Sequence, residues 1–361
     1  MRTLHIRRLG RVEYEDGLAA QKLLVEARAK DLVPDTLLLL EHPRVITLGR
    51  GAKAHNILWT PEQLSARGYA VYQTDRGGDV TYHGPGQLVG YPILDLKPDR
   101  KDVRKYVASV EELMIRVARS YGIESERIPG RIGVWTHSGK LGAIGVHISR
   151  WITSHGFAFN VHPDLNDFAA IVPCGISDAG VTSLESLLGD ARSMEEVEQR
   201  FAAAAAQVWE CDAFEVPHEL RTVSVTMLRE DGRVLLMKRA PERGGFWQIL
   251  TGCIEPGESA LPAAAREVHE ETGFAPRFDE LRELDYAHSF AMRDHMPPPF
   301  AHETSFVLKL SNGAEPRLAE PRLSDEHVDH RWCTVEEAMQ LLPFAGLRRA
   351  VQLATQTGSG P

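Results

Sequence analysis

The stretch Ile171-Val172-Pro173-Cys174-Gly175-Ile176 organises the first two-thirds of this 361-residue sequence. The proline fixes φ on one side of the cysteine, and the glycine leaves the backbone free on the other side. This combination favours a turn that holds the thiol at its tip, facing a cleft. A lone cysteine is more often a small buried hydrophobe, so a catalytic interpretation depends on what other segments supply.

Two upstream segments supply the chemistry that a thiol needs. Gly139-Lys140-Leu141-Gly142-Ala143-Ile144-Gly145 places a lysine among small and apolar residues, where burial favours the neutral amine that acts as a base. Arg76-Gly77-Gly78-Asp79-Val80-Thr81-Tyr82-His83-Gly84-Pro85-Gly86-Gln87 is a long glycine-rich loop with one cation. A thiol, a desolvated amine and a glycine-walled pocket together indicate acyl transfer through a thioester. Cys174 and Lys140 are the candidate catalytic residues.

Residues 1 to about 212 resemble the octanoyltransferases of lipoate biosynthesis. The resemblance is carried, in the family's order, by Arg76-Gly77-Gly78 through His83-Gly84-Pro85-Gly86-Gln87, Lys140 with Ala143-Ile144-Gly145, Arg150-Trp151, His155-Gly156-Phe157-Ala158 and Pro173-Cys174-Gly175. It implies a fold like that of the catalytic domain of biotin and lipoate ligases. It also implies a substrate pocket formed by Arg76, Gly77, Gly78, Asp79, Val80, Thr81, Tyr82, His83, Ala143, Ile144, Gly145, Gly156, Phe157 and Ala158.

The family chemistry implies that Cys174 takes an octanoyl group from octanoyl-acyl carrier protein. A lysine of a lipoyl domain of the 2-oxoacid dehydrogenases, or of the glycine cleavage H protein, then attacks the acyl-enzyme. Lys140 would move protons in both steps, and this domain would need no cofactor. An ATP-dependent lipoate ligase and a non-catalytic module that docks lipoyl domains are the alternatives. Cys174 together with Lys140 favours the transferase over both.

A second motif begins at Gly252 and fills every fixed position of the Nudix box: Gly252, Glu258, Arg266, Glu267, Val268, Glu270, Glu271, Gly273 and Phe274. Ser259 favours the start of a helix, and Gly273 favours its end. On that helix the last three glutamates of the box share one face, where they repel one another. Carboxylates grouped in this way suit Mg²⁺ or Mn²⁺ at a diphosphate, with Arg266 placed to hold one of them. A solvated acidic helix face is the alternative.

Segments outside the box are similar to dihydroneopterin triphosphate pyrophosphatases: Phe246-Trp247-Gln248, Glu303-Thr304-Ser305-Phe306, and Glu326-His327 leading to Arg331-Trp332. The resemblance implies a metal-dependent pyrophosphohydrolase that acts on a nucleotide-like, diphosphate-linked substrate. The metal ligands would be Glu267, Glu270, Glu271 and Glu326, although a surface glutamate is an equal alternative for Glu326. The other function that fits is a nucleotide-sensing module that regulates the transferase. Such sensors usually lose box glutamates, and all are present here.

The length of the sequence indicates two domains in one chain. A sequence of 361 residues exceeds the usual size of one core, and we expect domains at 1–213 and 218–361. The net charge is −9 and neither half is basic, which disfavours nucleic acid as a partner. No long apolar run indicates a signal peptide or a membrane span, so we expect a cytoplasmic protein. The scattered cysteines, Cys174, Cys211, Cys253 and Cys333, indicate free thiols.

Hydrophobic periodicity predicts a mixed α/β fold in both domains. Helices are expected at 14–30, 103–121 and 194–208. Strands are expected at 3–9 (an edge strand), 36–40, 45–48, 87–96 (a central strand), 132–136, 141–148 and 152–159. The second domain should begin with a hairpin of strands 222–228 and 233–239 around Asp231-Gly232. It is expected to form the α/β/α sandwich of the Nudix fold.

Overall fold

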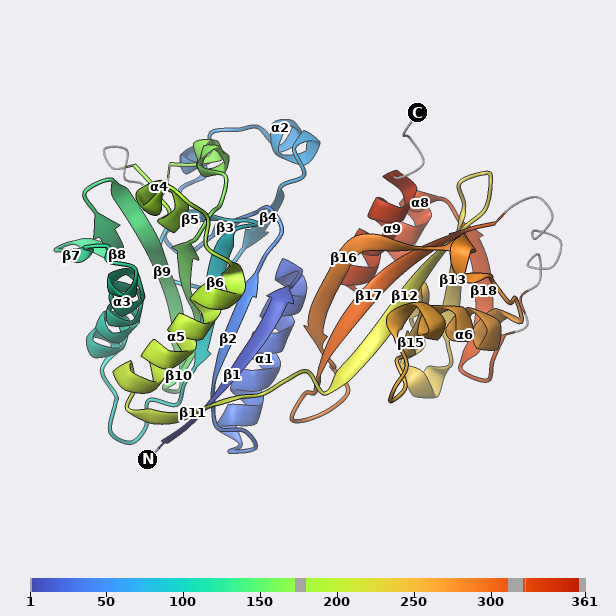
Figure 1. The fold of residues 1–361 in the computed structure, drawn as a ribbon, viewed down its shortest axis with the longest axis horizontal. Coiled ribbons are helices and arrows are strands. Elements are labelled where there is room, and N and C mark those ends of the chain that lie inside the picture. Colours follow the sequence, from blue (N-terminus) through green and yellow to red (C-terminus); the bar gives the residue numbers. More distant parts are fainter. Residues whose placement is uncertain (1, 173–179, 311–320, 322, 357–361) are drawn as a thin grey trace. The chain divides into compact units, whose positions relative to one another are not determined.

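The computed structural model describes residues 2–172, 180–310, 321 and 323–356. The chain forms two compact units (Figure 1), Met1–Pro217 with Arg293–Pro298, and His218–Met292 with Pro299–Pro361. Within the described residues, no helix is both long enough and apolar enough to cross a membrane. The cysteines there, Cys211, Cys253 and Cys333, carry free thiols. Cys174 lies outside the described residues.

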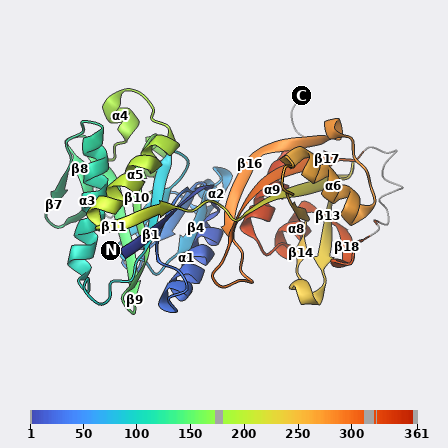
Figure 2. The same cartoon turned by 60° about the horizontal axis from the view of Figure 1, so that its bottom comes forward.

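An eight-stranded mixed sheet forms the centre of the first unit, in the order β11-β1-β2-β6-β10-β9-β8-β7. Its strands are β1 (Arg2–Arg11), β2 (Asp35–Glu41), β6 (Gln87–Ile93), β7 (Glu126–Ile128), β8 (Arg131–Thr136), β9 (Gly139–Ser149), β10 (Ile152–Asn160) and β11 (Cys211–Glu215). The expected central position of β6 is confirmed. The expected edge position of β1 is wrong, because β11 pairs with it in parallel (Figure 2). That partner comes from some 200 residues away along the chain, and local alternation carries no sign of it.

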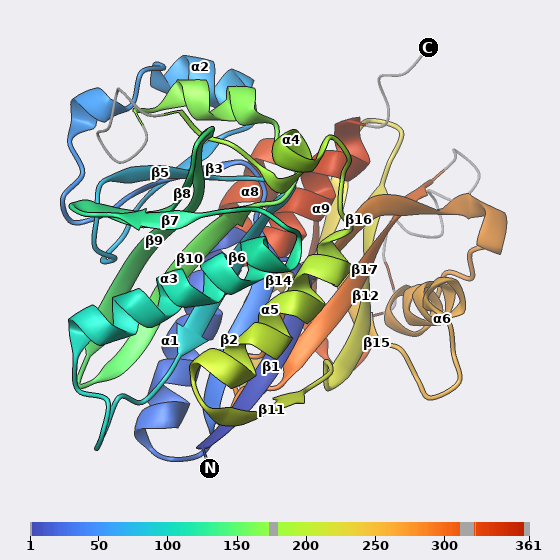
Figure 3. The same ribbon diagram turned by 60° about the vertical axis from the view of Figure 1, so that its left-hand side comes forward.

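Helices cover both faces of this sheet. α3 (Val103–Ser120) and α5 (Met194–Val208) pack against each other across one face (Figure 3). Val110, Leu113 and Val117 of α3 belong to the core on that face. The side chain of Asp102 caps α3 by accepting from the backbone of Arg104 at 3.0 Å. α1 (Tyr14–Ala29) contacts β6 and β10 from the opposite face. The three expected helices are therefore confirmed.

A smaller sheet of the first unit carries the glycine-rich loop. It has the order β4-β3-β5, with β3 (Val45–Leu48), β4 (Ala70–Gln73) and β5 (Val80–His83). The loop leads into β5, and β6 follows β5 after a short turn. Around this sheet lie α2 (Pro61–Ala66) and the 3₁₀ helices η1 (Ala54–Asn56) and η2 (Leu165–Ala170), while α4 (Leu184–Leu188) precedes α5. The small sheet therefore sets where the loop meets the large one.

The second unit is a sheet between helices, as expected for a Nudix sandwich. Its strands are β12 (Leu220–Leu228), β13 (Val234–Arg239), β14 (Trp247–Gln248), β15 (Leu250–Cys253), β16 (Leu281–Ala291), β17 (Phe300–Lys309) and β18 (His327–Cys333). α6 (Ala260–Thr272) covers one face, and α8 (Val335–Leu341) and α9 (Ala345–Gln356) cover the other (Figure 3). β12 and β13 meet at the Asp231-Gly232 turn, where Gly232 has φ 80°. Beyond the turn β12 pairs with β15 and, in parallel, with β17.

Candidate active sites

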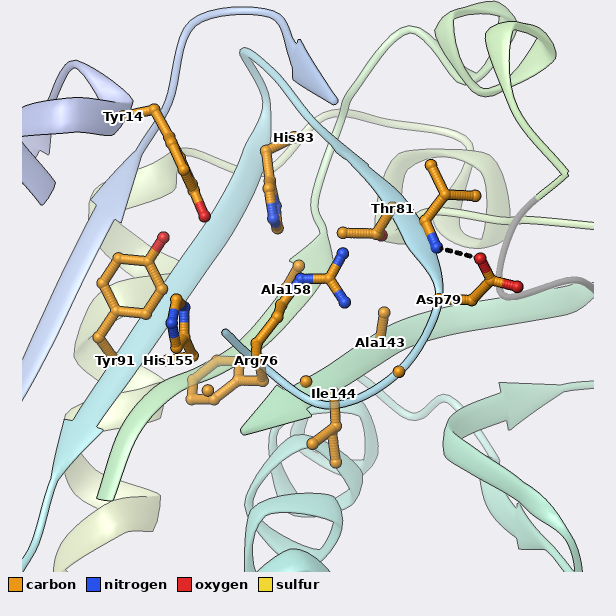
Figure 4. A pocket seen from close by; sticks show the side chains of 15 residues that line it. Tyr14, Arg76, Asp79, Thr81, His83, Tyr91, Ala143, Ile144, His155 and Ala158 are labelled. Atoms are coloured by element: carbon orange, nitrogen blue, oxygen red, sulfur yellow. Dashed lines mark hydrogen bonds between the residues drawn. The ribbon is translucent and has the colours of Figure 1, made fainter. Parts of the chain in front are cut away.

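A cavity in the first unit lies where the glycine-rich loop meets β5, β6, β9 and β10. Its empty space, open solvent included, is about 480 Å³. The lining residues are Tyr14, Arg76, Gly78, Asp79, Val80, Thr81, His83, Tyr91, Ala143, Ile144, Gly145, His155, Gly156, Phe157 and Ala158. Figure 4 shows the rings of Tyr14, His83, Tyr91 and His155 on one side of this space and Thr81 with Ala143 on the other. The motif segments of the sequence therefore converge on one cavity. Of the residues that the resemblance assigns to the substrate, Gly77 and Tyr82 do not line it.

Tyr82 has a different task. Its hydroxyl donates to Asp167 Oδ2 at 2.6 Å, while Tyr69 donates to Oδ1 at 2.5 Å and Arg44 donates at 2.9 Å. Burial opposes ionisation of Asp167, but these three hydrogen bonds outweigh it and hold the pKa of the carboxyl below its usual range. Asp167 lies in η2, shortly before the segment that carries Cys174. Tyr82 thus helps to hold η2 in place.

Arg76 is buried and bonds to the backbone around it. Its guanidinium donates to the carbonyl of Thr47 at 2.7 Å, to the hydroxyl of Thr47 at 2.8 Å, and to the carbonyl of Gly77 at 3.0 Å. It therefore ties the glycine-rich loop to β3 and also lines the cavity. The next glycine, Gly78, has φ 88°, a left-handed conformation that favours glycine.

Rings line one side of the cavity, and His42, which does not line it, packs against two of them, Tyr14 and His83. His42 contacts the carbonyl of Val12 through Nδ1 and the hydroxyl of Tyr91 through Nε2, both at 2.7 Å. A carbonyl only accepts, so Nδ1 of His42 carries the proton and Nε2 accepts from Tyr91. Burial lowers the pKa of His42 to about 4, and burial raises the pKa of Tyr14 well above its usual value. Sequence analysis missed Tyr14 and Tyr91, because an aromatic residue at a helix start or in an apolar strand carries no local sign of a cavity.

Lys140 lines a second, smaller cavity of about 300 Å³. The lining residues are Thr81, Gln87, Lys140, Gly142, Ala143, Asn160, Phe168 and Val181, and Thr81 and Ala143 also line the first cavity. Lys140 is 6% exposed on β9, and its Nζ lies 5.1 Å from the centre of the Trp135 ring. The lysine is buried, as its small and apolar neighbours predict.

The described residues on either side of Cys174 are anchored close to both candidate segments. The backbone N–H of Val172 donates to the carbonyl of Asn56 at 2.8 Å. The side chain of Asn56 in turn donates to Asp79 of the glycine-rich loop at 2.6 Å. On the other side Val181 pairs with Lys140, whose N–H donates to the carbonyl of Gly180 at 2.9 Å. Val172 therefore lies close to the glycine-rich loop, and Gly180 lies close to Lys140.

In the second unit, Arg266 holds several box carboxylates together. Its guanidinium donates to Glu258 at 3.0 Å, to Glu267 at 2.9 Å and to Glu270 at 3.0 Å. It also donates to the carbonyl of Cys253 at 2.8 Å. Sequence analysis expected one carboxylate partner, and the structure shows three. One cation thus fixes the start of the box to the middle of α6.

The ends of α6 differ from each other. Gly273 ends the helix with φ 74°, and its N–H donates to the carbonyl of His269 at 2.8 Å, as expected for a C-terminal cap. Ser259 occupies the N-cap position, so the expected helix start is confirmed, but its side chain makes no capping hydrogen bond. Glu258 beside it is held by Arg266 instead.

The box brings Glu267 against Gly252. A Cβ on Gly252 would lie 1.8 Å from the carboxyl carbon of Glu267, so a larger residue there would displace this carboxylate. Burial raises the pKa of Glu267, Arg266 opposes this, and the neighbouring Glu270 and Glu271 raise it further. Among the residues that the structure describes, no three His, Cys, Asp or Glu side chains are grouped closely enough to hold a metal. The donor set of Glu267, Glu270 and Glu271 is still chemically suited to a hard cation.

Glu271 is held by residues from two distant motifs. His327 Nδ1 lies 2.7 Å from its carboxylate, and His327 Nε2 lies 3.2 Å from the amide nitrogen of Gln248. Burial opposes ionisation of Glu271, but hydrogen bonds from His327 and Ser324 keep its pKa below the usual range. The sequence singled out the segments of Gln248 and His327 without assigning these contacts. Glu326 instead pairs with Arg239 at 3.3 Å and Arg243 at 2.7 Å, and its role as a ligand stays a prediction.

Comparisons with known proteins agree with the two units. Residues 13–206 match the family model of the lipoyl protein ligase A/B catalytic domain, and residues 218–353 match that of the NUDIX domain. An octanoyltransferase of Myxococcus xanthus is 49% identical over 364 residues, which cover 98% of this chain and all of that protein. A putative lipoate protein ligase from T. acidophilum matches 60% of this chain and 90% of its own, at 14% identity and a TM-score of 0.48. The E. coli dihydroneopterin triphosphate pyrophosphohydrolase matches 39% of this chain and 97% of its own, at 25% identity and a TM-score of 0.33.

The chain belongs to the octanoyltransferase family, with a lipoyl protein ligase A/B catalytic domain followed by a Nudix domain. It is an enzyme with features of a transferase and of a hydrolase. The two resemblances drawn from its motifs are thereby confirmed.

Proposed function

We propose that the first unit transfers an octanoyl group from octanoyl-acyl carrier protein to a lysine of lipoyl domains in the cytoplasm. The acceptors are the lipoyl domains of the 2-oxoacid dehydrogenases and the glycine cleavage H protein. The observation that carries this proposal is the cavity, which is built from the motif segments in a chain 49% identical to an octanoyltransferase over nearly its whole length.

In the first step the thiolate of Cys174 attacks the carbonyl carbon of the octanoyl thioester. A new carbon–sulfur bond forms to Cys174, and the bond to the carrier's thiol breaks. Lys140 takes the proton of Cys174 before attack and gives it to the departing thiolate of the carrier. The anchoring of Gly180 and Val181 on Lys140 supports this pairing. The octanoyl chain occupies the cavity, where it displaces water and so limits hydrolysis of the acyl-enzyme.

In the second step the neutral amine of the acceptor lysine attacks the acyl-enzyme. A carbon–nitrogen bond forms, and the carbon–sulfur bond to Cys174 breaks. Lys140 accepts a proton from the nitrogen and returns it to the sulfur of Cys174. The products are an octanoyl amide, the free carrier and the original enzyme. No ATP is consumed, because the thioester already stores the activation that an ATP-dependent lipoate ligase must create.

Intact-mass spectrometry tests this proposal directly. The full chain is incubated with octanoyl-acyl carrier protein alone, and a lipoyl domain is then added. We expect one octanoyl adduct on the enzyme, localised to Cys174 by peptide mapping, and its disappearance as the lipoyl domain gains the same mass. An enzyme that modifies the lipoyl domain only from free octanoate and ATP would contradict the proposal and favour the ligase.

We further propose that the second unit is a metal-dependent pyrophosphohydrolase acting on a nucleotide-like, diphosphate-linked substrate. Glu267, Glu270 and Glu271 would hold Mg²⁺ or Mn²⁺, with Glu326 as an additional ligand. The cation would supply charge stabilisation at the diphosphate and an activated water. The observation that favours hydrolysis over nucleotide sensing is the complete carboxylate set, which Arg266 and His327 hold in place.

The residues around these carboxylates have separate tasks. One terminal nitrogen of the Arg266 guanidinium donates to both Glu267 and Glu270 and orients them. The other terminal nitrogen donates to Glu258. The hydrogen bond from His327 favours the ionised form of Glu271. Gly252 leaves the space that the carboxylate of Glu267 fills. These contacts keep like charges together, although their electrostatic repulsion destabilises the helix. A helix with only a structural role would not require such a cluster.

A further inference from the structure

His83 is the one histidine in the family motif of the glycine-rich loop, and its ring faces the first cavity (Figure 4). The residue ends β5 and is 7% exposed. Its Nδ1 lies 2.8 Å from Oε1 of Gln87, so Nε2 is the nitrogen left for the cavity. Whether Nε2 donates or accepts there depends on which nitrogen carries the proton.

A chain of hydrogen bonds decides the position of that proton. It starts at the carbonyl of Thr182, which can only accept and takes an N–H from the amide of Asn160 at 2.9 Å. The oxygen of Asn160 must then face Gln87, whose amide nitrogen donates to it at 3.0 Å. This leaves the oxygen of Gln87 facing His83, so Nδ1 of His83 carries the proton and Nε2 keeps its lone pair. Because a backbone carbonyl anchors the chain, neither amide can be turned over without breaking a bond.

The ring also stays uncharged. The pKa of His83 is lowered to about 3, chiefly by burial and also by the nearby His42 and Arg76, against the hydrogen bond to Gln87 that raises it. Tyr14 stacks on the ring with centroids 6.4 Å apart. At neutral pH His83 therefore has one proton, on Nδ1, and a lone pair on Nε2. It cannot act as an acid in the cavity.

The same chain reaches the backbone of the candidate base. The N–H of Thr182 donates to the carbonyl of Lys140 at 3.0 Å. Gln87 and Asn160 line the second cavity together with Lys140, while His83 lines the first. One set of hydrogen bonds therefore links the lysine's strand to the ring that faces the acyl pocket. Thr81 and Ala143 are shared between the two cavities.

We infer that Gln87 and Asn160 are positioning residues for the second half-reaction, which hold His83 so that its Nε2 accepts a hydrogen bond from the attacking lysine amine. The inference rests on the proposed transferase function. The octanoyl thioester has no polar hydrogen at its acyl group, so an acceptor gains nothing from that substrate. The amine has two N–H groups. One is lost to Lys140 as the carbon–nitrogen bond forms and the bond to Cys174 breaks, and the other is held by His83, which takes no proton itself.

Nitrogen-15 spectra of the full chain, labelled at histidine, test the chain of hydrogen bonds without any turnover. The signals of His83 are assigned by their loss in His83→Asn. We expect Nδ1 to show the protonated form and Nε2 the unprotonated form from pH 6 to pH 9. In Gln87→Met the acceptor for Nδ1 is gone, and the Nε2–H form should gain population. A proton on Nε2 in the wild-type protein would overturn the inference.

Kinetics of the two half-reactions supply the second measurement. Acylation is followed by mass after mixing with octanoyl-acyl carrier protein, and transfer is followed by chasing the acyl-enzyme with a lipoyl domain. Gln87→Met should slow the chase by about tenfold, as for loss of one hydrogen bond, and leave acylation within about twofold. Gln199→Met, an exposed change on α5, is the matched control and should change neither. Equal slowing of both half-reactions would contradict the inference.

The two proposals fail in distinguishable ways. A wild-type enzyme that never forms an acyl adduct would overturn the transferase function itself. If the wild-type enzyme transfers octanoyl groups and the Gln87→Met variant has the same chase rate, only the role of Gln87 and Asn160 is overturned. Equal melting temperatures of Gln87→Met and Gln199→Met show that a slow chase does not reflect a damaged fold.

Discussion

The two candidate sites of this chain hold their polar groups in opposite ways. Buried rings that stay neutral line one side of the cavity of the first unit. Mainly through burial, the pKa of His83 in that lining is lowered to about 3, and that of His42, which packs against His83, to about 4. In the second unit Glu267 and Glu271 are also buried, but they lie beside Arg266 and His327. These rings suit an acyl chain and an uncharged amine, and the charged groups that also line the cavity, Arg76 and Asp79, are hydrogen-bonded to the chain around them. A carboxylate cluster suits a cation at a diphosphate.

The first prediction tests the neutral site at its thiol. Cys174→Ala should lower octanoyl transfer by about 10³-fold or more, because no covalent intermediate can form. The measurement is transfer to a lipoyl domain together with the intact mass of the enzyme. Cys211→Ala removes a half-buried thiol elsewhere in the first unit and is the control. Transfer by Cys174→Ala near the wild-type rate would rule out covalent catalysis.

The second prediction tests whether Lys140 acts as a base or only supplies a positive charge. Lys140→Ala should slow acylation and deacylation by about 10²-fold or more, since one base serves both steps. Lys140→Arg should not rescue either step, because a guanidinium stays protonated at any working pH. Both rates come from the pulse and chase described for the acyl-enzyme. A fully active Lys140→Arg enzyme would mean that the position only needs a positive charge.

The third prediction tests the charged site and its independence. Glu267→Gln should lower pyrophosphate release from a nucleoside-triphosphate-like substrate with Mg²⁺ by about 10²-fold, because it removes one negative group at the site. Glu283→Gln, an exposed change on β16, is the control and should have no effect. Octanoyl transfer should be unaffected in both variants. If Glu267→Gln released product at the wild-type rate, the metal site would be contradicted. An equal loss of octanoyl transfer in this variant would favour a nucleotide-sensing role for the second unit.

The smallest effect concerns stability against pH. The pKa of His42 is about 4 in the folded chain, against 6.5 as its ordinary value. Its contribution to stability is complete above pH 6.5 and is lost as pH falls toward 4, because the unfolded chain binds the proton first. The loss is about 1.4 kcal/mol per pH unit in that window.

Urea unfolding of the full chain at pH 7 and pH 5 measures this contribution. His42→Gln, which forms hydrogen bonds but does not titrate, should lose less stability between the two values than the wild-type protein. His55→Gln, at an exposed position, should behave like the wild-type protein. Identical losses in all three proteins would show that His42 is not the group that titrates.

Local sequence determined the elements and the motif residues. The apolar periodicity of 103–121 and 194–208 predicts α3 and α5, since helices of this length are set by their own amphipathic faces. The spacing of the box predicts that Gly273 ends α6, because a left-handed cap suits glycine. Only the family resemblance predicted that three segments share one cavity: the glycine-rich loop, Ala143-Ile144-Gly145 and Gly156-Phe157-Ala158. No local sequence pattern indicates that they lie together.

Tertiary structure alone decided the partners of these residues. The pairing of β1 with β11 depends on strands some 200 residues apart, and the protonation of His83 depends on Asn160 and Thr182. His327 reaches Glu271 across 56 positions. A sequence states which side chains can donate or accept. Only the fold states which of them meet, and a buried group takes its charge and its proton from those neighbours.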